Sequence, residues 1–186
     1  MPDNTIILLR PGSGQNILGL PLLLRAIIAC RQAGLGTFYL IGSGSEEELR
    51  LVERVKKDRR VLPFSSDLHY FQAGSLSTED KIKSQELFEW PGSFLLLDGE
   101  AIFDPLLLED LNFFEPQERE IILFKSPADS IPDSTWSGLA VGSGKILPEL
   151  LAGLLSIKEG ENDLLRTLPP TALVSYQIVP AGHFFL

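Results

Sequence analysis

A glycine-rich segment near the N-terminus has the residue types of an anion-binding loop. It follows the apolar run Thr5–Leu9 and consists of Pro11, Gly12, Ser13 and Gly14. Glycines permit close approach and positive φ angles, so successive backbone N–H groups can point at a phosphate. The same residues could equally form a tight strand-to-helix turn without a ligand. The segment is not a P-loop, because no Gly-Lys-Ser/Thr follows it. It is not a dinucleotide fingerprint either, because Ile17 occupies the third glycine position.

An acidic segment ends a second apolar run, Ser93–Leu97. It consists of Asp98, Gly99 and Glu100. Two carboxylates one residue apart at a strand end can hold a divalent cation through hard oxygen ligands. Mg²⁺ is the expected cation, because it accepts few protein ligands and is usually shared with substrate phosphates. The alternative is a plain Asp-Gly turn, in which both residue types are common.

The other polar motifs favour structural roles. Gly142–Lys145 (Gly-Ser-Gly-Lys) lacks the first half of a Walker pattern and is interpreted as a turn into a helix. His69 and His183 lie far apart and belong to no triad or metal spacing. The absence of a Gly-x-Ser-x-Gly elbow gives hydrolase chemistry little support. The basic cluster of Arg54–Arg60 is interpreted as a solvated helix face.

Composition limits the class of protein. The 186 residues suit one domain, and the net charge of −9 argues against a nucleic-acid surface. A single cysteine, Cys30, excludes a disulfide framework and a cysteine-based metal site. No apolar stretch is long enough for a bilayer span, and no signal peptide precedes the first strand, so a cytoplasmic location is expected. The apolar final residues, Gly182–Leu186, suggest the N-terminal part of a longer polypeptide.

Hydrophobic periodicity predicts alternating strands and helices that position the two segments. The predicted strands are Thr5–Leu9, Thr37–Ile41, Arg60–Phe64, Ser93–Leu97, Glu120–Phe124, Ser137–Val141 and Ala172–Val179, with a last one beginning near His183. The predicted helices are Pro21–Ala33, Glu46–Lys57, Glu79–Glu89, Pro105–Leu111, Ile146–Ile157 and Glu161–Leu168. Polar loops are expected over residues 65–78 and 126–134, and Ser45 with Glu48 predicts a capping box.

This alternation predicts an α/β protein, a three-layer Rossmann-like fold with a mostly parallel, mixed central sheet. Ligands of such sheets bind outside the carboxyl ends of the strands. If the first strand and the strand over Ser93–Leu97 are neighbours, the glycine segment and the acidic segment meet in one cleft.

These residues together resemble the sugar-nucleotidyltransferase-like domain. The resemblance rests on Gly12 and Gly14 of the loop, on Gly19–Leu23 (Gly-Leu-Pro-Leu-Leu), on Ala33-Gly34, and on Phe94–Glu100. Phe103–Pro105 and Ser137–Val141 are similar to further segments of that family. The resemblance implies a Rossmann-like nucleotidyltransferase fold in which Asp98 and Glu100 hold Mg²⁺. It also implies that the nucleotide is bound by Pro11, Gly12, Ser13, Gly14 and Arg25.

More narrowly, the chain resembles the domain at the N-terminus of CDP-alcohol phosphatidyltransferase polypeptides. That resemblance implies one domain over residues 1–186, joined to a membrane-embedded transferase of phospholipid synthesis. The whole protein would then lie in the inner membrane. The implied reaction couples an NTP, expected to be CTP, to a polyol or sugar phosphate and releases pyrophosphate.

The loop departs from the family pattern in its charged residues. Gln15 and Asn16 stand in the region where the family has a Thr or Ser and an Arg, and Leu20 precedes Pro21 near the family's lysine. Phosphate charge would then be met by backbone dipoles, the metal, Arg10 or Arg25. Two functions therefore stay open: an active nucleotidyltransferase, or a catalytically degenerate nucleotide-binding, regulatory or interaction module of the membrane transferase.

Overall fold

The computed structural model describes residues 4–72, 92–103, 105–111, 114–125, 137–156 and 168–178. Seven of the described strands form one sheet in the order β5-β4-β1-β6-β8-β7-β9. The pairs β5–β4, β4–β1, β1–β6 and β7–β9 are parallel, whereas β8 runs antiparallel to both of its neighbours. The sheet is therefore mostly parallel and mixed, which confirms the predicted fold class.

The strands of this sheet are β1 (Asn4–Leu8), β4 (Thr37–Gly42), β5 (Leu68–Gln72), β6 (Ser93–Asp98), β7 (Glu120–Lys125), β8 (Leu139–Ser143) and β9 (Leu173–Ile178). A two-stranded hairpin consists of β2 (Asn16–Ile17) and β3 (Leu20–Pro21). The α-helices are α1 (Leu22–Gln32), α2 (Glu46–Lys56), α4 (Pro105–Asp110) and α5 (Leu147–Ser156), and the 3₁₀ turns are η1 (Pro11–Gly14), η2 (Leu62–Asp67) and η4 (Gly144–Ile146).

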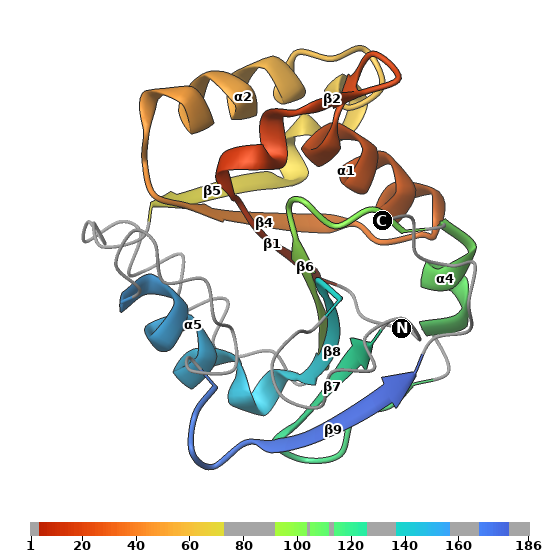
Figure 1. Ribbon diagram of the computed structural model, residues 1–186, viewed down its shortest axis with the longest axis vertical. Coiled ribbons are helices and arrows are strands. Elements are labelled where there is room, and N and C mark those ends of the chain that lie inside the picture. The colour runs from red at the N-terminus through yellow and green to blue at the C-terminus, as the bar shows by residue number, and fades with distance from the viewer. Residues whose placement is uncertain are drawn as a thin grey trace.

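Helices cover both faces of the sheet (Figure 1). Successive strand residues point to opposite faces, so Ile7 packs in the cluster under α1 and α2, while Ile6 and Leu8 pack in the cluster under α5. Phe38, Phe94 and other large side chains in these clusters have no exposed surface. The result is a three-layer arrangement, in which the continuous apolar runs of β1 and β6 are explained by burial on both faces.

Local sequence signals account for the two helices beside the glycine segment. Ser45 caps α2 by accepting a hydrogen bond from the Glu48 N–H at 3.3 Å, as predicted. The reciprocal half of the capping box is absent: the Glu48 carboxylate accepts from the Gly44 N–H at 3.0 Å instead. Helix α1 ends just before Gly34, whose φ of 88° lies in the left-handed region that glycine favours.

Two segments differ from prediction. The strand predicted over Arg60–Phe64 is absent. Pro63 has no N–H to donate to a neighbouring strand, and the 3₁₀ turn η2 begins at Leu62 instead. The strand β5 follows at Leu68, within the segment that was predicted to be a polar loop. The hairpin of β2 and β3 was not predicted. Its turn residues, Leu18 and Gly19, have φ values of 51° and 80°. Two-residue hairpin turns of this kind usually contain Asn-Gly. Leu18 stands in the asparagine position, so the sequence lacks the motif by which such a hairpin is predicted.

The other predicted elements that fall on described residues occur within about two residues of their predicted bounds. The helices predicted over Glu79–Glu89 and Glu161–Leu168, the loop over 126–134 and the strand near His183 lie wholly or almost wholly outside the described residues. Within the described part of the chain, every helix is too short or too polar to cross a bilayer.

Candidate functional site

The sheet brings the glycine segment and the acidic segment together. Strands β1 and β6 are parallel neighbours, with Leu8 in register with Asp98, so their carboxyl ends share one edge of the sheet. The η1 turn follows β1 and the residues 99–103 follow β6. The two strands are thus neighbours, and the meeting of the two segments that was expected in that case is observed.

The glycine segment has a defined shape. The Arg10 N–H donates to the Ser13 hydroxyl at 2.8 Å, and the Ser13 N–H donates back to the Arg10 carbonyl at 3.0 Å. Ser13 is fully buried. Gly99 lies close to this turn: its N–H donates to the Leu8 carbonyl at 2.8 Å, and a Cβ at this position would overlap the Ser13 hydroxyl. Close packing thus explains why residue 99 is glycine.

Two contacts join the glycine segment to the acidic pair, and we call them the bridging contacts. The Arg10 guanidinium donates from Nε to Asp98 Oδ2 at 3.0 Å, and the Gly12 N–H donates to Glu100 Oε1 at 2.6 Å. The side chains of Arg10 and Asp98 are only 12% and 19% exposed. Hydrogen bonds that involve an ionised group at such partly buried positions are stronger than those between neutral groups.

The acidic turn is also held within itself. Asp98 Oδ1 accepts from the Glu100 N–H at 2.9 Å, as in an Asx turn, and the Asp98 N–H donates to the Gly138 carbonyl at 2.7 Å. The geometry of the Asp-Gly turn is therefore present. Gly138 has a φ of 83°, and a Cβ there would lie 3.0 Å from that of Asp98, so β8 approaches the turn closely.

Asp98 and Glu100 have the oxygen donors that Mg²⁺ prefers. Among the described residues no group of three or more His, Cys, Asp or Glu side chains could hold a metal. Mg²⁺ often takes only one or two carboxylates and completes its shell with water and phosphate oxygens. The pair fits such a site by donor type and number, with the bridging contacts engaging one oxygen of each carboxylate. The Mg²⁺ site stays a prediction.

The remaining predicted site residue, Arg25, is placed elsewhere. It lies on α1, and its guanidinium donates to the Ile17 carbonyl at 3.3 Å. It borders a mostly apolar cavity of about 640 Å³ between the β2–β3 hairpin, α1, residues 101–103 and Pro105. The structure brings Pro11, Gly12, Ser13, Gly14, Asp98 and Glu100 together and leaves Arg25 beside the hairpin.

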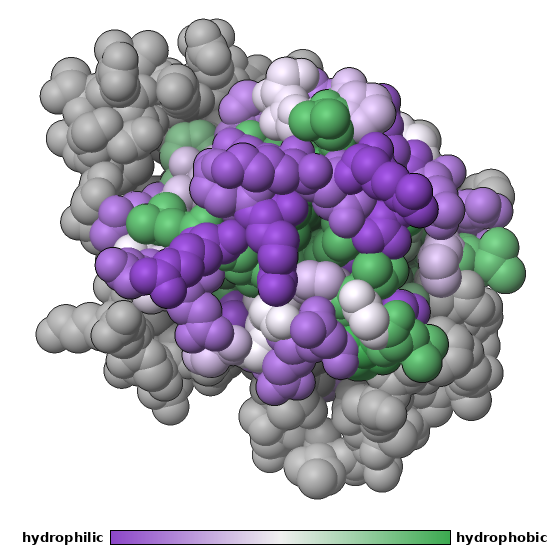
Figure 2. Space-filling view, turned by 90° about the horizontal axis from the view of Figure 1, so that it is seen from above, coloured by the Kyte–Doolittle hydropathy of each residue, from purple (hydrophilic) through white to green (hydrophobic). Residues whose placement is uncertain are grey.

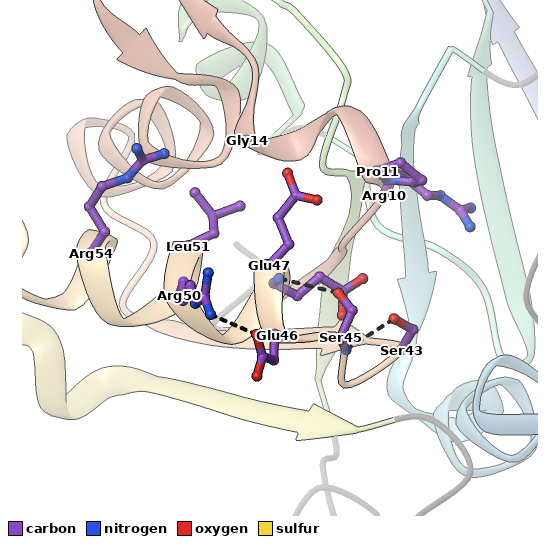
Figure 3. Close-up of a pocket in the computed structure, with 11 residues that line it drawn as sticks. Arg10, Pro11, Gly14, Ser43, Ser45, Glu46, Glu47, Arg50, Leu51 and Arg54 are labelled. Atoms are coloured by element: carbon purple, nitrogen blue, oxygen red, sulfur yellow. Dashed lines mark hydrogen bonds and ion pairs between the residues drawn. The ribbon is translucent and has the colours of Figure 1, made fainter.

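A second cavity, of about 740 Å³, lies between η1 and α2 (Figure 3). Pro11 and Gly14 form its η1 side, and Ser43 lies at its edge after β4. On α2, Glu47, Leu51 and Arg54 are spaced i, i+4, i+7 and point toward η1 in Figure 3. Arg54 was predicted to be a solvated residue; it is exposed, yet it also lines this cavity. Helical spacing from the buried Leu51 is the signal that identifies this face.

The surface above this cavity is polar. Figure 2 views the face on which α2 and the hairpin lie, and hydrophilic side chains predominate there, with apolar ones visible between them. Arg50 forms an exposed ion pair with Glu46 at 2.6 Å.

Glu48 also contacts β5, because its carboxylate accepts a hydrogen bond from the Tyr70 hydroxyl at 3.4 Å. Burial, together with the Glu48 charge, raises the pKa of Tyr70 to about 12, so its phenol is neutral at physiological pH.

The Gly142–Lys145 turn does not contribute to this site. Ser143 ends β8 and caps η4, and the Lys145 ammonium pairs with Glu118 at 2.5 Å on the surface. This agrees with the predicted turn into a helix.

Comparisons with known proteins bear on the fold. No family model and no curated protein matches the sequence. Among solved structures, the inositol-1-phosphate CTP transferase from T. maritima has a TM-score of 0.58 and 16% identity over 95% of this chain and 85% of its own. The 4-diphosphocytidyl-2C-methyl-D-erythritol synthase from Anaerococcus prevotii has a TM-score of 0.60 and 11% identity over 98% and 91%.

A putative glucose-1-phosphate thymidylyltransferase from Bacillus anthracis is similar over 95% of this chain and 87% of its own, with a TM-score of 0.55 and 12% identity. At these identities the likeness concerns the fold. The chain shares a Rossmann-like fold with these three solved structures.

Proposed function

We propose that this domain transfers a nucleotidyl group from a nucleoside triphosphate, CTP in the first instance, to a phosphorylated polyol or sugar. An acceptor phosphate oxygen attacks the α-phosphorus, and a new P–O bond forms. The bond from the α-phosphorus to the bridging oxygen breaks, and the electron pair leaves with pyrophosphate. The fold, which the solved inositol-1-phosphate CTP transferase shares, supports this reaction class.

The observation that carries the proposal is the 2.6 Å contact between the Gly12 N–H and the Glu100 carboxylate. It indicates that the glycine segment presents an N–H able to hold an anionic oxygen at the carboxyl end of β1. The cavity of about 740 Å³ beside Pro11 and Gly14 is within the usual size of small-molecule sites. The triphosphate is thus proposed to lie at Gly12 and the nucleoside to extend toward α2.

In this proposal each residue has a limited role. Asp98 and Glu100 would hold Mg²⁺, which when bound neutralises phosphate charge. Gly12 and Gly14 allow the backbone to approach the phosphates, and Ser13 fixes the shape of the turn. Arg10 positions Asp98. Because preorganised charge is the main source of catalysis in such transfers, a loop with Gln15 and Asn16 instead of basic residues is expected to give slow turnover.

A second candidate function is a degenerate nucleotide-binding or regulatory module. The bridging contacts favour it, because they engage both predicted metal ligands with the segment that would hold phosphate. In either case we propose that the domain serves a CDP-alcohol phosphatidyltransferase of phospholipid synthesis, as part of the same polypeptide. Its contact with the membrane would then arise from that further part.

The test incubates the full-length protein with Mg²⁺, CTP and a panel of polyol phosphates, and measures pyrophosphate release and thermal stability. Release above the blank supports the transferase. A CTP-dependent rise in Tm without release supports the binding module. If CTP causes neither pyrophosphate release nor a rise in Tm, both candidate functions are contradicted. Asp98→Ala is expected to abolish the Mg²⁺-dependent CTP shift, measured against its own Tm. Asp110→Ala, at an exposed position on α4, is the matched control.

A further inference from the structure

We propose that Glu100 is an internal ligand of the glycine segment and holds the phosphate position closed until an external anion displaces it. This inference deepens the proposed function and rests on its placement of phosphate at Gly12. The ligand class it concerns is the di- or triphosphate group. Its effect would be to couple phosphate binding to the release of the acidic pair.

The first support is the occupancy of the Gly12 N–H. Glu100 Oε1 lies 2.6 Å from this nitrogen. This distance is slightly shorter than the usual range of about 2.7–2.9 Å for a charge-assisted N–H···O hydrogen bond. A carboxylate and a phosphate present the same kind of charged oxygen acceptor. One N–H cannot donate a strong bond to both, so a phosphate at Gly12 must compete with Glu100.

The second support is the coupling of Glu100 to Asp98. The Glu100 N–H donates to Asp98 Oδ1, while Asp98 Oδ2 accepts from Arg10. Both carboxylates of the turn are therefore tied to the segment Arg10–Gly12. An anion that takes the Gly12 N–H frees Glu100, and it also offers Arg10 a second negative partner. Phosphate binding thus favours release of both carboxylates toward a cation, and by linkage a cation on them favours phosphate binding.

The third support is that the glycine segment cannot easily move away. Ser13 is buried, its hydroxyl accepts a hydrogen bond from the Arg10 N–H, and its own N–H donates to the Arg10 carbonyl. Gly99 packs against Ser13. The Glu100 side chain, in contrast, has rotatable bonds of its own. Opening of this contact is therefore expected to move Glu100 and to leave η1 in place.

The experiment titrates the full chain with pyrophosphate in EDTA, so that no divalent cation contributes. Isothermal calorimetry gives the dissociation constant, and the ¹⁵N–¹H resonance of Gly12 reports the N–H itself. Glu100→Gln keeps the side-chain length and removes the charge. The Glu100→Gln chain is expected to bind pyrophosphate at least about tenfold more tightly than the unmodified chain. The reason is that the closed state, in which residue 100 occupies the Gly12 N–H, loses its hydrogen bond to a charged group.

Glu109→Gln is the matched control, because Glu109 is exposed on α4 and lines neither of the two cavities described above. It removes the same charge and reports the general electrostatic effect on an anion. If Glu109→Gln gains as much affinity as Glu100→Gln, or if Glu100→Gln gains none, the inference is overturned. If neither protein binds pyrophosphate, removal of Glu100 opens no anion site and the inference is wrong.

The unmodified chain provides a measurement that does not depend on how a variant folds. Saturating pyrophosphate is expected to shift the Gly12 amide resonance and the Glu100 side-chain carboxyl ¹³C resonance together. A shift at Gly12 with Glu100 unchanged contradicts the inference. The outcome is separate from turnover: tight pyrophosphate binding by Glu100→Gln with no transfer from CTP would support the inference and contradict the enzyme.

Discussion

The Arg10 guanidinium and the Asp98 carboxylate meet at 3.0 Å although 88 positions separate them in the chain. Arg10 follows β1 and Asp98 ends β6, so this ion pair joins the carboxyl ends of two central strands. Both side chains are largely buried, with exposures of 12% and 19%. The same carboxylate is a predicted metal ligand, so one residue stabilises the fold and is proposed to serve the site.

Asp98→Asn is therefore expected to lower the free energy of unfolding by about 2 kcal/mol, because it removes the charge of the carboxylate to which the largely buried Arg10 guanidinium donates. Urea unfolding followed by circular dichroism measures the loss. The exposed Asp110→Asn is expected to change stability by less than about 0.5 kcal/mol. Equal values for the two variants would show that the ion pair contributes nothing net.

Gly99→Ala is expected to destabilise the protein by about 2 kcal/mol. The added Cβ would lie 2.8 Å from the Leu8 carbonyl oxygen and overlap the Ser13 hydroxyl, so backbone of β1 must move. Gly36→Ala is the control, because its nearest contact would be the Arg31 guanidinium at 3.8 Å. Thermal unfolding of both variants measures the difference. A Gly99→Ala protein as stable as the control would contradict the close packing described here.

Leu18→Asn is expected to raise the free energy of unfolding by about 0.5–1 kcal/mol. Leu18 is 89% exposed and has a φ of 51°, so it contributes little burial and adopts a conformation that asparagine tolerates better. Leu62→Asn, at a 59% exposed position without a positive φ, lacks this gain. Denaturant titration compares the two. A loss of stability in Leu18→Asn would indicate that the leucine side chain is needed.

The surface pair of Asp58 and Arg60 predicts a small acid dependence of stability. The Arg60 hydrogen bonds and charge lower the pKa of Asp58 from 3.8 to about 2. Stability from this pair is therefore fully present above pH 4 and is lost as the pH falls through 2. Solvent screening limits it to less than about 1 kcal/mol. The unfolding free energies of the native chain and Asp58→Asn should differ at pH 6 and converge near pH 2. A difference that persists there would contradict the assignment.

Much of the fold could be predicted because its signals are local. The apolar runs of β1 and β6, Ser45 before α2 and Gly34 after α1 each identify an element without reference to the rest of the chain. The sequence left open whether β1 and β6 are neighbours, and their parallel pairing in the sheet brings the glycine and acidic segments together. Elements with weak local signals were missed, as Leu18 in place of asparagine illustrates for the hairpin.

The contacts within the site could not be predicted in the same way. If β1 and β6 are neighbours, Gly12 and Glu100 lie at the same edge of the sheet. The side-chain conformation then decides whether the carboxylate faces a cation or the loop. The position of Arg25 likewise depends on the hairpin, which brings the Ile17 carbonyl within its reach. Leu51 is buried beneath Gly14, and only this packing shows that Arg54 borders the cavity.

The position of β1 inside the sheet has a consequence for how the protein is made. Residues 4–72 contain β4, β5, α1 and α2, so one side of β1 can pair while synthesis continues. Its other side must wait for β6, and Asp98 must wait for Gly138 before its N–H finds a partner. Long-range pairing of this kind is slow. The cavity between η1 and α2 lies wholly within the early segment, because its lining runs from Arg10 to Arg54. The acidic pair of the proposed site, Asp98 and Glu100, is thus expected to join it late, after an intermediate with one open edge of β1 has emerged from the ribosome.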